Sequence, residues 1–335
     1  VVKADAYGHG LVPVAKAALE GGATWLGVAL LEEAIKLRAA GVTAPILAWL
    51  VPPGSDFQSA VDNNIDIAVA SIKALDEVSA VKSEKRPRVH LEVDTGMTRG
   101  GFLDEWPKID ALHLHGVEII GIFSHFARAD EPGQPQNLSQ LNRFKKMVAS
   151  LESFGYPNLI RHLSNSAATI NDQSSTFDMV RTGIAMYGLS PDVKTLGTSK
   201  ELGLIPAMTL RAKLHLVKKV PAGSPVGYGA TAVTKSATKL GLVAMGYADG
   251  IPRIAQSAGV SFLGKKAPII GRVSMDQFVV DLGADSTAQS GDWVTIFGIG
   301  AAGEYTADDW GAASGSINYE IVTRIGPRVP RIYEL

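Results

Sequence analysis

The stretch "VVKADAYGHG", residues 1–10, opens the series of short β-rich segments that decides the fold. Val1–Lys3 has the composition of a strand that ends on a lysine, and a polar, glycine-containing turn follows it. Similar strand-like runs lie at Trp25–Ala29, Pro45–Leu50, Ile65–Ala70, Val89–Asp94, Val117–Ser124, Leu159–Ser164 and Met179–Tyr187. Eight β segments separated by helical patterns favour a (β/α)8 TIM-type barrel, with an open doubly wound sheet as the alternative.

The segments between these runs carry apolar residues at helical spacing. The clearest pattern is Leu138, Leu141, Phe144, Val148 and Leu151, and Gly155 follows it as the expected C-cap. This spacing predicts an amphipathic helix that packs on the barrel.

The pattern changes after about Leu204. In "MTLRAKLHLV" the apolar residues alternate with charged and polar ones, which predicts a half-buried strand with Leu210, Ala212, Leu214 and Leu216 on one face. Segments rich in turn-forming residues, such as "PAGSP" and "LGKKAP", follow. We therefore expect a barrel domain over residues 1–203 and a mostly antiparallel β domain over residues 204–335.

Composition excludes several classes of protein. The 335 residues are 46% apolar and carry a net charge of -1, which favours neither a nucleic-acid partner nor an anionic membrane surface. The chain has no cysteine, so it has neither disulfides nor a catalytic thiol, which fits a cytoplasmic protein. No apolar run approaches the roughly 20 residues of a membrane helix.

The barrel interpretation gives Lys3 a function. Active sites of such barrels lie at the carboxyl ends of the strands, where Lys3 is expected to point inward. A partly desolvated amine has a lowered pKa and becomes a nucleophile that can form a Schiff base. The alternative is an ordinary surface lysine at a strand end.

Further motifs decide between these alternatives. "VVKADAYGHG", "DTGMTRGG", "SHFARADE", "HLSNSAAT", "VRTGIAMYGLSP", "GYGAT", "GYADG", "GRVSMDQ" and "INYEIVTRIGPRVPRIY" occur in this order. Together they resemble the alanine racemase family, enzymes that use pyridoxal 5'-phosphate and combine a barrel with a β domain. Family members also carry a few dozen residues ahead of the lysine strand, so a segment before Val1 is expected.

The resemblance implies a reaction with two catalytic bases. Lys3 would carry the cofactor and serve one face of the substrate's Cα, while the tyrosine of "GYGAT", Tyr228, would serve the other face from a partner subunit. The pKa of an ordinary tyrosine is about 10, so Tyr228 needs nearby cations or donors to act near neutrality. The resemblance therefore also implies a homodimer with shared active sites.

The resemblance also implies the residues that hold the cofactor. Its phosphate would be held by Ser166 with its neighbour Asn165, by the backbone at Gly183 and Ile184, and by Tyr7 and Tyr319. Arg181 would face the ring nitrogen with His162 supporting it, and His125 would lie near the site. A guanidinium stays protonated and disfavours a second positive charge beside it, so the ring becomes a weaker electron sink. Related barrel decarboxylases place a carboxylate there instead.

Substrate recognition is implied in the same way, through Arg99, the Met275 amide, Asp276 and Tyr247. One departure from the family concerns Glu92, two residues before the "DTG" aspartate, where many members have a lysine that is carbamylated in several of them. Glu92 should face the barrel interior, and we expect it to supply a permanent negative charge for Arg99.

We expect no metal site. His113 and His115 form a short "HLH" pair, but no HExxH motif or carboxylate cluster accompanies them. The resemblance thus implies a bacterial enzyme that interconverts L-alanine and D-alanine and supplies D-alanine for peptidoglycan. A racemase of broader specificity and a non-catalytic carrier of the cofactor are the alternatives, and the β domain with Tyr228 argues against the carrier.

Overall fold

A computed structural model describes residues 1–109 and 114–334. The chain divides into two compact units. The first unit comprises residues 1–6, 10–186 and 190–202, and the second comprises residues 7–9, 187–189 and those from Gly203 onward. In the described ranges no helix has both the length and the apolar character that crossing a bilayer requires.

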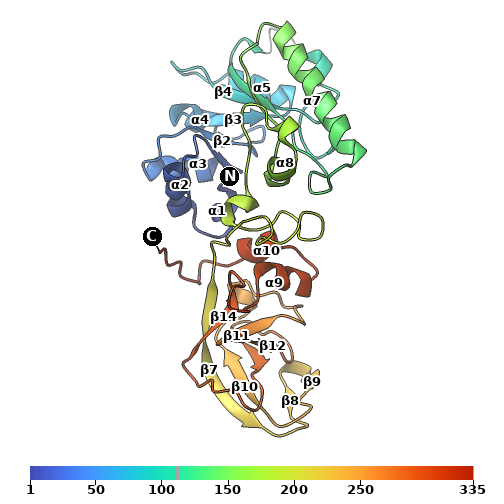
Figure 1. Cartoon of the computed structure of the whole chain (residues 1–335). Coiled ribbons are helices and arrows are strands. Elements are labelled where there is room, and N and C mark those ends of the chain that lie inside the picture. The colour runs from blue at the N-terminus through green and yellow to red at the C-terminus, as the bar shows by residue number, and fades with distance from the viewer. Residues whose placement is uncertain (110–113, 335) are drawn as a thin grey trace. The chain divides into compact units, whose positions relative to one another are not determined.

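The first unit is built around a six-stranded parallel sheet whose strands are paired in sequence order (Figure 1). The strands are β1 (Leu26–Val28), β2 (Ile46–Ala48), β3 (Asp66–Val69), β4 (Arg88–Glu92), β5 (Glu118–Phe123) and β6 (Ile160–His162). The helices are α1 (Lys3–Tyr7), α2 (Leu11–Glu20), α3 (Leu31–Ala39), α4 (Phe57–Asp62), α5 (Ile72–Ser79), α7 (Pro135–Ser153) and α8 (Ser166–Asn171). Strand–helix alternation of this kind produces a parallel sheet, because each crossover returns the chain in the same direction.

Two of the eight predicted strands are wrong. Val1–Lys3 makes one bond to the sheet, from the amide of Val2 to the carbonyl of Gly27 at 2.8 Å, and the chain then turns because Ala6 donates to Val2. The stretch Met179–Tyr187 likewise ends in a short 3-10 turn.

These two segments nevertheless close the barrel. The amide of Arg181 donates to Ser164, just beyond β6, at 2.9 Å. The backbone nitrogen of Val1 donates to the carbonyl of Thr182 at 2.9 Å. Single hydrogen bonds thus join the two edges of the six-stranded sheet, and the predicted barrel class is confirmed.

The amphipathic helix expected around Leu141 is α7, which ends before Gly155 at a φ of 92°. Leu141, Phe144, Val148 and Leu151 are buried, but Leu138 is 61% exposed, because it lies in the first turn of the helix.

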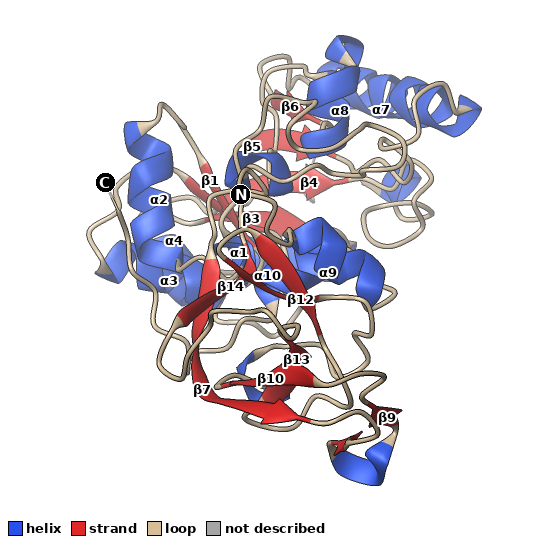
Figure 2. Ribbon diagram, turned by 60° about the horizontal axis from the view of Figure 1, so that its bottom comes forward, coloured by secondary structure: helices blue, strands red, loops and turns tan. Residues whose placement is uncertain are grey.

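The second unit contains a six-stranded antiparallel sheet in the order β12-β11-β14-β7-β10-β13 (Figure 2). Its strands are β7 (Leu210–Val220), β10 (Thr238–Val243), β11 (Gly259–Phe262), β12 (Lys265–Pro268), β13 (Phe278–Asp281) and β14 (Trp293–Phe297), beside the pair β8 (Pro225–Val226) and β9 (Ala232–Val233). The helices α9 (Ala307–Ala313) and α10 (Asn318–Thr323) follow. The predicted antiparallel β class is confirmed for this part of the chain.

The alternation predicted for β7 is confirmed only in its first half. Leu210, Ala212 and Leu214 are buried, whereas Leu216 is 42% exposed. Next to the sheet, Trp310 of α9 is buried and donates its indole N–H to the carbonyl of Ile296 at 2.8 Å. The burial of apolar side chains along β7 thus ends after Leu214.

Candidate active site

Lys3 begins an unusual turn. Ala4, Asp5, Ala6 and Tyr7 all have φ values of 53° or 54°, in the left-handed region. A left-handed conformation costs roughly 1–2 kcal/mol for each non-glycine residue. Four such residues in a row persist only where the surrounding contacts hold them, and strain of this kind gathers at functional sites.

Two carboxylates hold this turn. Oε1 of Glu33 accepts the amide of Ala4 at 2.6 Å, and Oε2 accepts the amides of Ala29 and Leu30 at 3.0 and 3.1 Å. On the other side, Oδ1 of Asp5 accepts the amide of Leu11 at 2.8 Å. The backbone on the carboxyl side of Lys3 is therefore fixed from both sides.

The amine of Lys3 lies in a partly buried position. Its Nζ is 5.9 Å from the ring centroid of Trp49. Burial lowers the pKa of Lys3, the charge of Arg99 lowers it further, and the carboxylate of Glu33 partly opposes both. A lowered pKa increases the neutral, nucleophilic fraction of the amine, which is the form that condenses with an aldehyde.

Arg181 is held by acceptors on several sides. Its Nη1 donates to the carbonyl of His162 at 2.9 Å and lies 3.1 Å from Nδ1 of the same ring. Its Nη2 donates to the carbonyl of Ser124 at 2.6 Å and lies 3.1 Å from Nδ1 of His125. Burial lowers the pKa of Arg181 to about 10, with Glu92 opposing this effect, so the guanidinium remains charged at neutral pH. The contacts thus fix a cation in one orientation.

His125 lies among three positive charges. Burial, followed by the charges of Arg181, Arg99 and Lys3 in that order, lowers the pKa of His125 to about 3. The Nε2 atom of His125 is 3.5 Å from the side-chain amide of Asn165, which also caps α8 by accepting the amide of Ala168. The predicted residues Lys3, Arg99, Arg181 and His125 are therefore close enough to influence one another's charge.

A small cradle lies at the start of α8. The hydroxyl oxygen of Ser166 accepts the amide of Gly183 at 2.8 Å and that of Ala185 at 3.3 Å. Ile184, between these two residues, is fully buried. Because the oxygen of Ser166 accepts these amides, its own O–H proton is left to donate to an anionic group.

Arg99 projects from a loop that follows β4. Oδ1 of Asp94 accepts the amides of Gly96, Met97 and Thr98 at 2.8, 3.1 and 3.1 Å, and Thr98 adopts a φ of 57°. This turn determines where Arg99, an exposed residue, leaves the strand.

Glu92 is partly buried at the end of β4. Burial raises the pKa of Glu92, whereas Arg99 and then Arg181 lower it without reversing the shift. Glu92 is thus within the electrostatic reach of both arginines, and its role as their counter-charge stays a prediction.

The remaining predicted residues belong to the second unit. Tyr7 packs against Tyr187 with ring centroids 4.8 Å apart and against Tyr319 at 6.3 Å. Burial raises the pKa of Tyr7 to about 12, so its phenol remains a proton donor. The structure thus brings together the two tyrosines assigned to the phosphate, and a third ring, that of Tyr187, packs on Tyr7.

The loops that carry Tyr228, Tyr247, Met275 and Asp276 are exposed. Tyr228 is 73% exposed in a short 3-10 turn, and a Cβ on the neighbouring Gly229 would lie 3.5 Å from Arg272. The amide of Tyr247 donates to Ser274 at 3.1 Å, and the amide of Ala248 donates to Met275 at 2.9 Å. Asp276 accepts a hydrogen bond from Arg328 at 2.8 Å. The loop of residues 271–277 therefore runs past both the Tyr228 turn and the Tyr247 turn.

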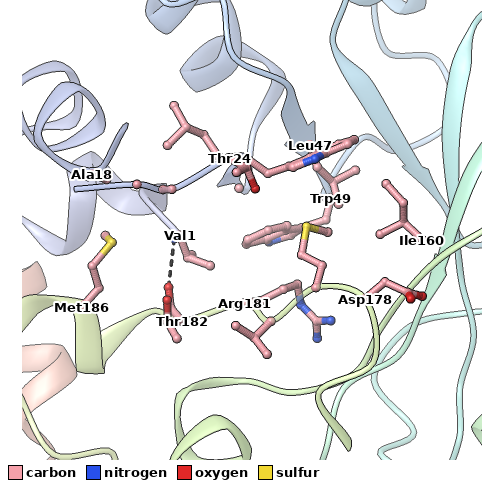
Figure 3. A pocket seen from close by; sticks show the side chains of 17 residues that line it. Val1, Ala18, Thr24, Leu47, Trp49, Ile160, Asp178, Arg181, Thr182 and Met186 are labelled. Atoms are coloured by element: carbon pink, nitrogen blue, oxygen red, sulfur yellow. Dashed lines mark hydrogen bonds between the residues drawn. The ribbon is translucent and has the colours of Figure 1, made fainter. Parts of the chain in front are cut away.

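A pocket of about 400 Å³ lies beside Arg181 in the first unit (Figure 3). Leu47, Trp49, Met179 and Val1 line it together with Arg181. Of the predicted site residues only Arg181 borders this pocket, so we do not identify it with the cofactor site.

Sequence reasoning missed Glu33 and Trp49. Glu33 is the third residue of α3 and accepts the amide of Leu30, the N-cap residue, which is the glutamate half of a capping box. A glutamate at that position is the signal that identifies it. Among the described residues no three His, Cys, Asp or Glu side chains gather as a metal site, and His113 lies outside those residues.

Known proteins match this chain over nearly its whole length. Residues 1–191 match the family "Alanine racemase, N-terminal domain", and residues 207–333 match "Alanine racemase, C-terminal domain". The alanine racemase of Beutenbergia cavernae is 51% identical over 342 residues, which cover 99% of this chain and 90% of the relative. That of Frankia casuarinae is 49% identical over 342 residues, covering 99% and 88%. The crystal structure of alanine racemase from D-cycloserine-producing Streptomyces lavendulae has a TM-score of 0.96 at 49% identity, covering 99% of this chain and 89% of that one.

Proposed function

This chain belongs to the alanine racemase family, a family of isomerases, and we propose that it interconverts L-alanine and D-alanine with pyridoxal phosphate carried by Lys3. The observation that supports this proposal most is the cluster of Lys3, Arg99 and Arg181 around a neutral His125. A partly desolvated amine beside fixed guanidinium groups suits a substrate carboxylate and a Schiff-base cofactor.

The donor set fits this cofactor. Lys3 has the lowered pKa that Schiff-base formation needs, and the hydroxyl of Ser166, held by two backbone amides, can donate to a phosphate. The proton-donating phenols of Tyr7 and Tyr319 are proposed to complete that phosphate site. When bound, pyridoxal phosphate withdraws electron density from the Cα of an amino acid and makes its proton removable.

Two residues of this chain are proposed to move that proton. Lys3 takes the proton from one face of Cα in its neutral form and returns a proton to that face in its protonated form. Inversion requires a second group on the opposite face, and Tyr228 is the assigned residue. Because Tyr228 is 73% exposed, its phenol is available to a second copy of the chain. We therefore propose a homodimer in which each site combines Lys3 of one subunit with Tyr228 of the partner subunit.

Arg181 is proposed to keep the cofactor ring weakly electron-withdrawing. With a pKa of about 10 it is protonated at neutral pH and can only donate hydrogen bonds. A permanent donor next to the ring nitrogen disfavours protonation of that nitrogen. Such an arrangement favours return of the proton to Cα over its loss to side reactions.

Substrate selection is proposed to depend on Arg99, which pairs with the carboxylate, and on the loops of Met275, Asp276 and Tyr247. One methylene group in a pocket discriminates by only about 1–3 kcal/mol, so serine is expected to be a slow substrate. The relatives named above are bacterial alanine racemases, and a chain without cysteine suits a reducing compartment. We therefore infer a cytoplasmic role that supplies D-alanine for peptidoglycan.

The proposal is tested by incubating the purified protein and pyridoxal phosphate with L-alanine, followed by chiral amino-acid analysis. We expect an equal mixture of both enantiomers and no conversion by Lys3→Ala. Binding of the cofactor without any D-alanine would instead indicate a carrier protein. Faster conversion of a larger amino acid would indicate a racemase of broader specificity.

A further inference from the structure

A line of buried polar groups continues beyond His162, on the side away from Arg181. Nε2 of His162 lies 2.8 Å from Nδ1 of His90, and both rings are fully buried. Nε2 of His90 lies 3.7 Å from Oδ2 of Asp66, a residue that is itself buried. Asp66 also accepts a hydrogen bond from Arg88 at 2.6 Å. The line thus runs from Arg181 on one side of the barrel interior to the first residues of β3 and β4.

The hydrogen bonds along this line have only one consistent direction. Arg181 has no acceptor atom, so Nδ1 of His162, at 3.1 Å from it, must present a lone pair. In a neutral imidazole the proton then lies on Nε2. Burial keeps the pKa of His162 well below its ordinary value, and the charge on Arg181 contributes, so the ring is neutral.

The same reasoning extends to His90. Because His162 donates from Nε2, Nδ1 of His90 must accept, and the proton of His90 lies on Nε2. This N–H faces the carboxylate of Asp66, and in the described part of the chain it has no partner at hydrogen-bonding distance. At 3.7 Å the contact is an electrostatic attraction instead of a strong hydrogen bond.

The two imidazoles alone could equally well be hydrogen-bonded in the reversed direction. His90 would then donate from Nδ1 to Nε2 of His162, and the proton of His162 would lie on Nδ1, where it would face the N–H groups of Arg181. The reversed chain is opposed at both ends of the line: by Arg181, which can only donate to His162, and by the carboxylate of Asp66, which would lie beside a lone pair on Nε2 of His90. Asp66 stays ionised because its interactions with His90 and Arg88 outweigh the effect of burial and lower the pKa of Asp66.

We propose that Asp66 is a positioning residue that selects the tautomers of His90 and His162 and so keeps a hydrogen-bond acceptor facing Arg181. The selection of tautomers is independent of the reaction, whereas its kinetic consequence rests on the proposed function. The competing explanation is that Asp66 only forms a structural ion pair with Arg88.

The test compares three variants by histidine side-chain 15N–1H correlation spectra, which distinguish Nδ1–H from Nε2–H, with His90→Gln for assignment. Wild type should show Nε2–H at both rings. In Asp66→Asn a population with Nδ1–H should appear at both. Arg88→Lys removes the pair of hydrogen bonds that Nε and Nη2 of Arg88 donate to Asp66 at 2.6 and 3.3 Å but keeps the carboxylate, so it should retain the wild-type tautomers. Glu118→Gln removes a second carboxylate, 3.8 Å from Arg88, and should also retain the wild-type tautomers.

The kinetic consequence is a fall in kcat/KM of roughly 10- to 100-fold in Asp66→Asn, the loss expected when the charged hydrogen bond from Arg181 to His162 is no longer maintained. Equal effects of Asp66→Asn and Arg88→Lys on the spectra would overturn the proposal in favour of a structural pair. Unchanged tautomers in Asp66→Asn would also overturn it. If this variant does not fold, an Nδ1–H tautomer at His162 in wild type overturns the proposal by itself. A wild-type protein without racemase activity would refute the proposed function but leave the spectra decisive.

Discussion

Glu33 accepts the backbone amide of Ala4 at 2.6 Å, directly after the lysine assigned to the cofactor. The same carboxylate accepts two amides that follow β1, so one side chain links the Lys3 turn to the end of a barrel strand. Glu33 therefore holds a strained left-handed turn in place, and it also influences the charge of Lys3.

Glu33→Gln should weaken this link. An amide can still accept hydrogen bonds, but it loses the charge that strengthens them, so we expect the free energy of unfolding to fall by about 1–3 kcal/mol. The measurement is urea unfolding monitored by tryptophan fluorescence. Glu32→Gln, at the exposed neighbouring position, is the matched control and should change little. Equal effects of the two substitutions would show that the link contributes no stability.

Arg181→Lys should reduce turnover without unfolding the protein. A lysine ammonium lacks the planar fork that reaches Ser124 and both histidines, so the cation is no longer fixed. We expect kcat/KM for alanine to fall by about 10- to 100-fold. Arg161→Lys, at a partly exposed pair with Asp178, should retain activity. Full turnover by Arg181→Lys would contradict the assigned role.

Glu92→Gln tests the departure from the family pattern. If Glu92 supplies the counter-charge for Arg99, its neutralisation should let Arg99 move and raise KM for alanine several-fold. The steady-state kinetics in both directions should be compared with those of Glu118→Gln, an exposed glutamate on the next strand. Unchanged KM and kcat would remove Glu92 from the substrate site.

The pH dependence of stability follows from the buried histidines. Burial lowers the pKa of His90, His162 and His125, the last to about 3, whereas an unfolded histidine titrates near 6.5. Between these values the unfolded chain binds more protons, so stability is greatest above pH 6.5 and decreases as the pH falls. The limiting slope is about 1.4 kcal/mol per pH unit for each histidine.

Urea unfolding between about pH 7.5 and 5 measures this slope. His162→Gln should reduce the slope of unfolding free energy against pH by up to the contribution of one histidine. His215→Gln, at an exposed position of β7, should leave this slope unchanged. A slope that is the same in His162→Gln as in wild type would mean that His162 is not held neutral.

The sequence predicted the parts of the fold that depend on periodicity. Alternation identified β7 as far as Leu214, and helical spacing identified α7, because both patterns record which face is buried. The same patterns failed at Leu138 and Leu216, where the local packing ends. Composition also suggested a strand at Val1–Lys3, because it records a preference for extended backbone and not whether a neighbouring ladder continues.

The candidate site shows a similar limit. Lys3 and Arg181 could be named because they lie in motifs whose neighbours in sequence are characteristic. The contact of Glu33 with Ala4 and the roles of Asp66 and His90 could not be predicted, because these contacts join strands and turns far apart in the chain. No local pattern shows that Ala4 to Tyr7 turn left-handed, since none of these residues is a glycine.

The most direct test of a shared active site is subunit mixing. Lys3→Ala and Tyr228→Phe should each be nearly inactive for racemisation, because each lacks one base at both sites. When the two variants are unfolded and refolded together in equal amounts, half the dimers are hybrids with one intact site, so about a quarter of wild-type activity should return. Refolding each variant alone should return none. If the mixture remains as inactive as its components, or if Tyr228→Phe alone racemises alanine at the full rate in both directions, the two bases do not come from two chains.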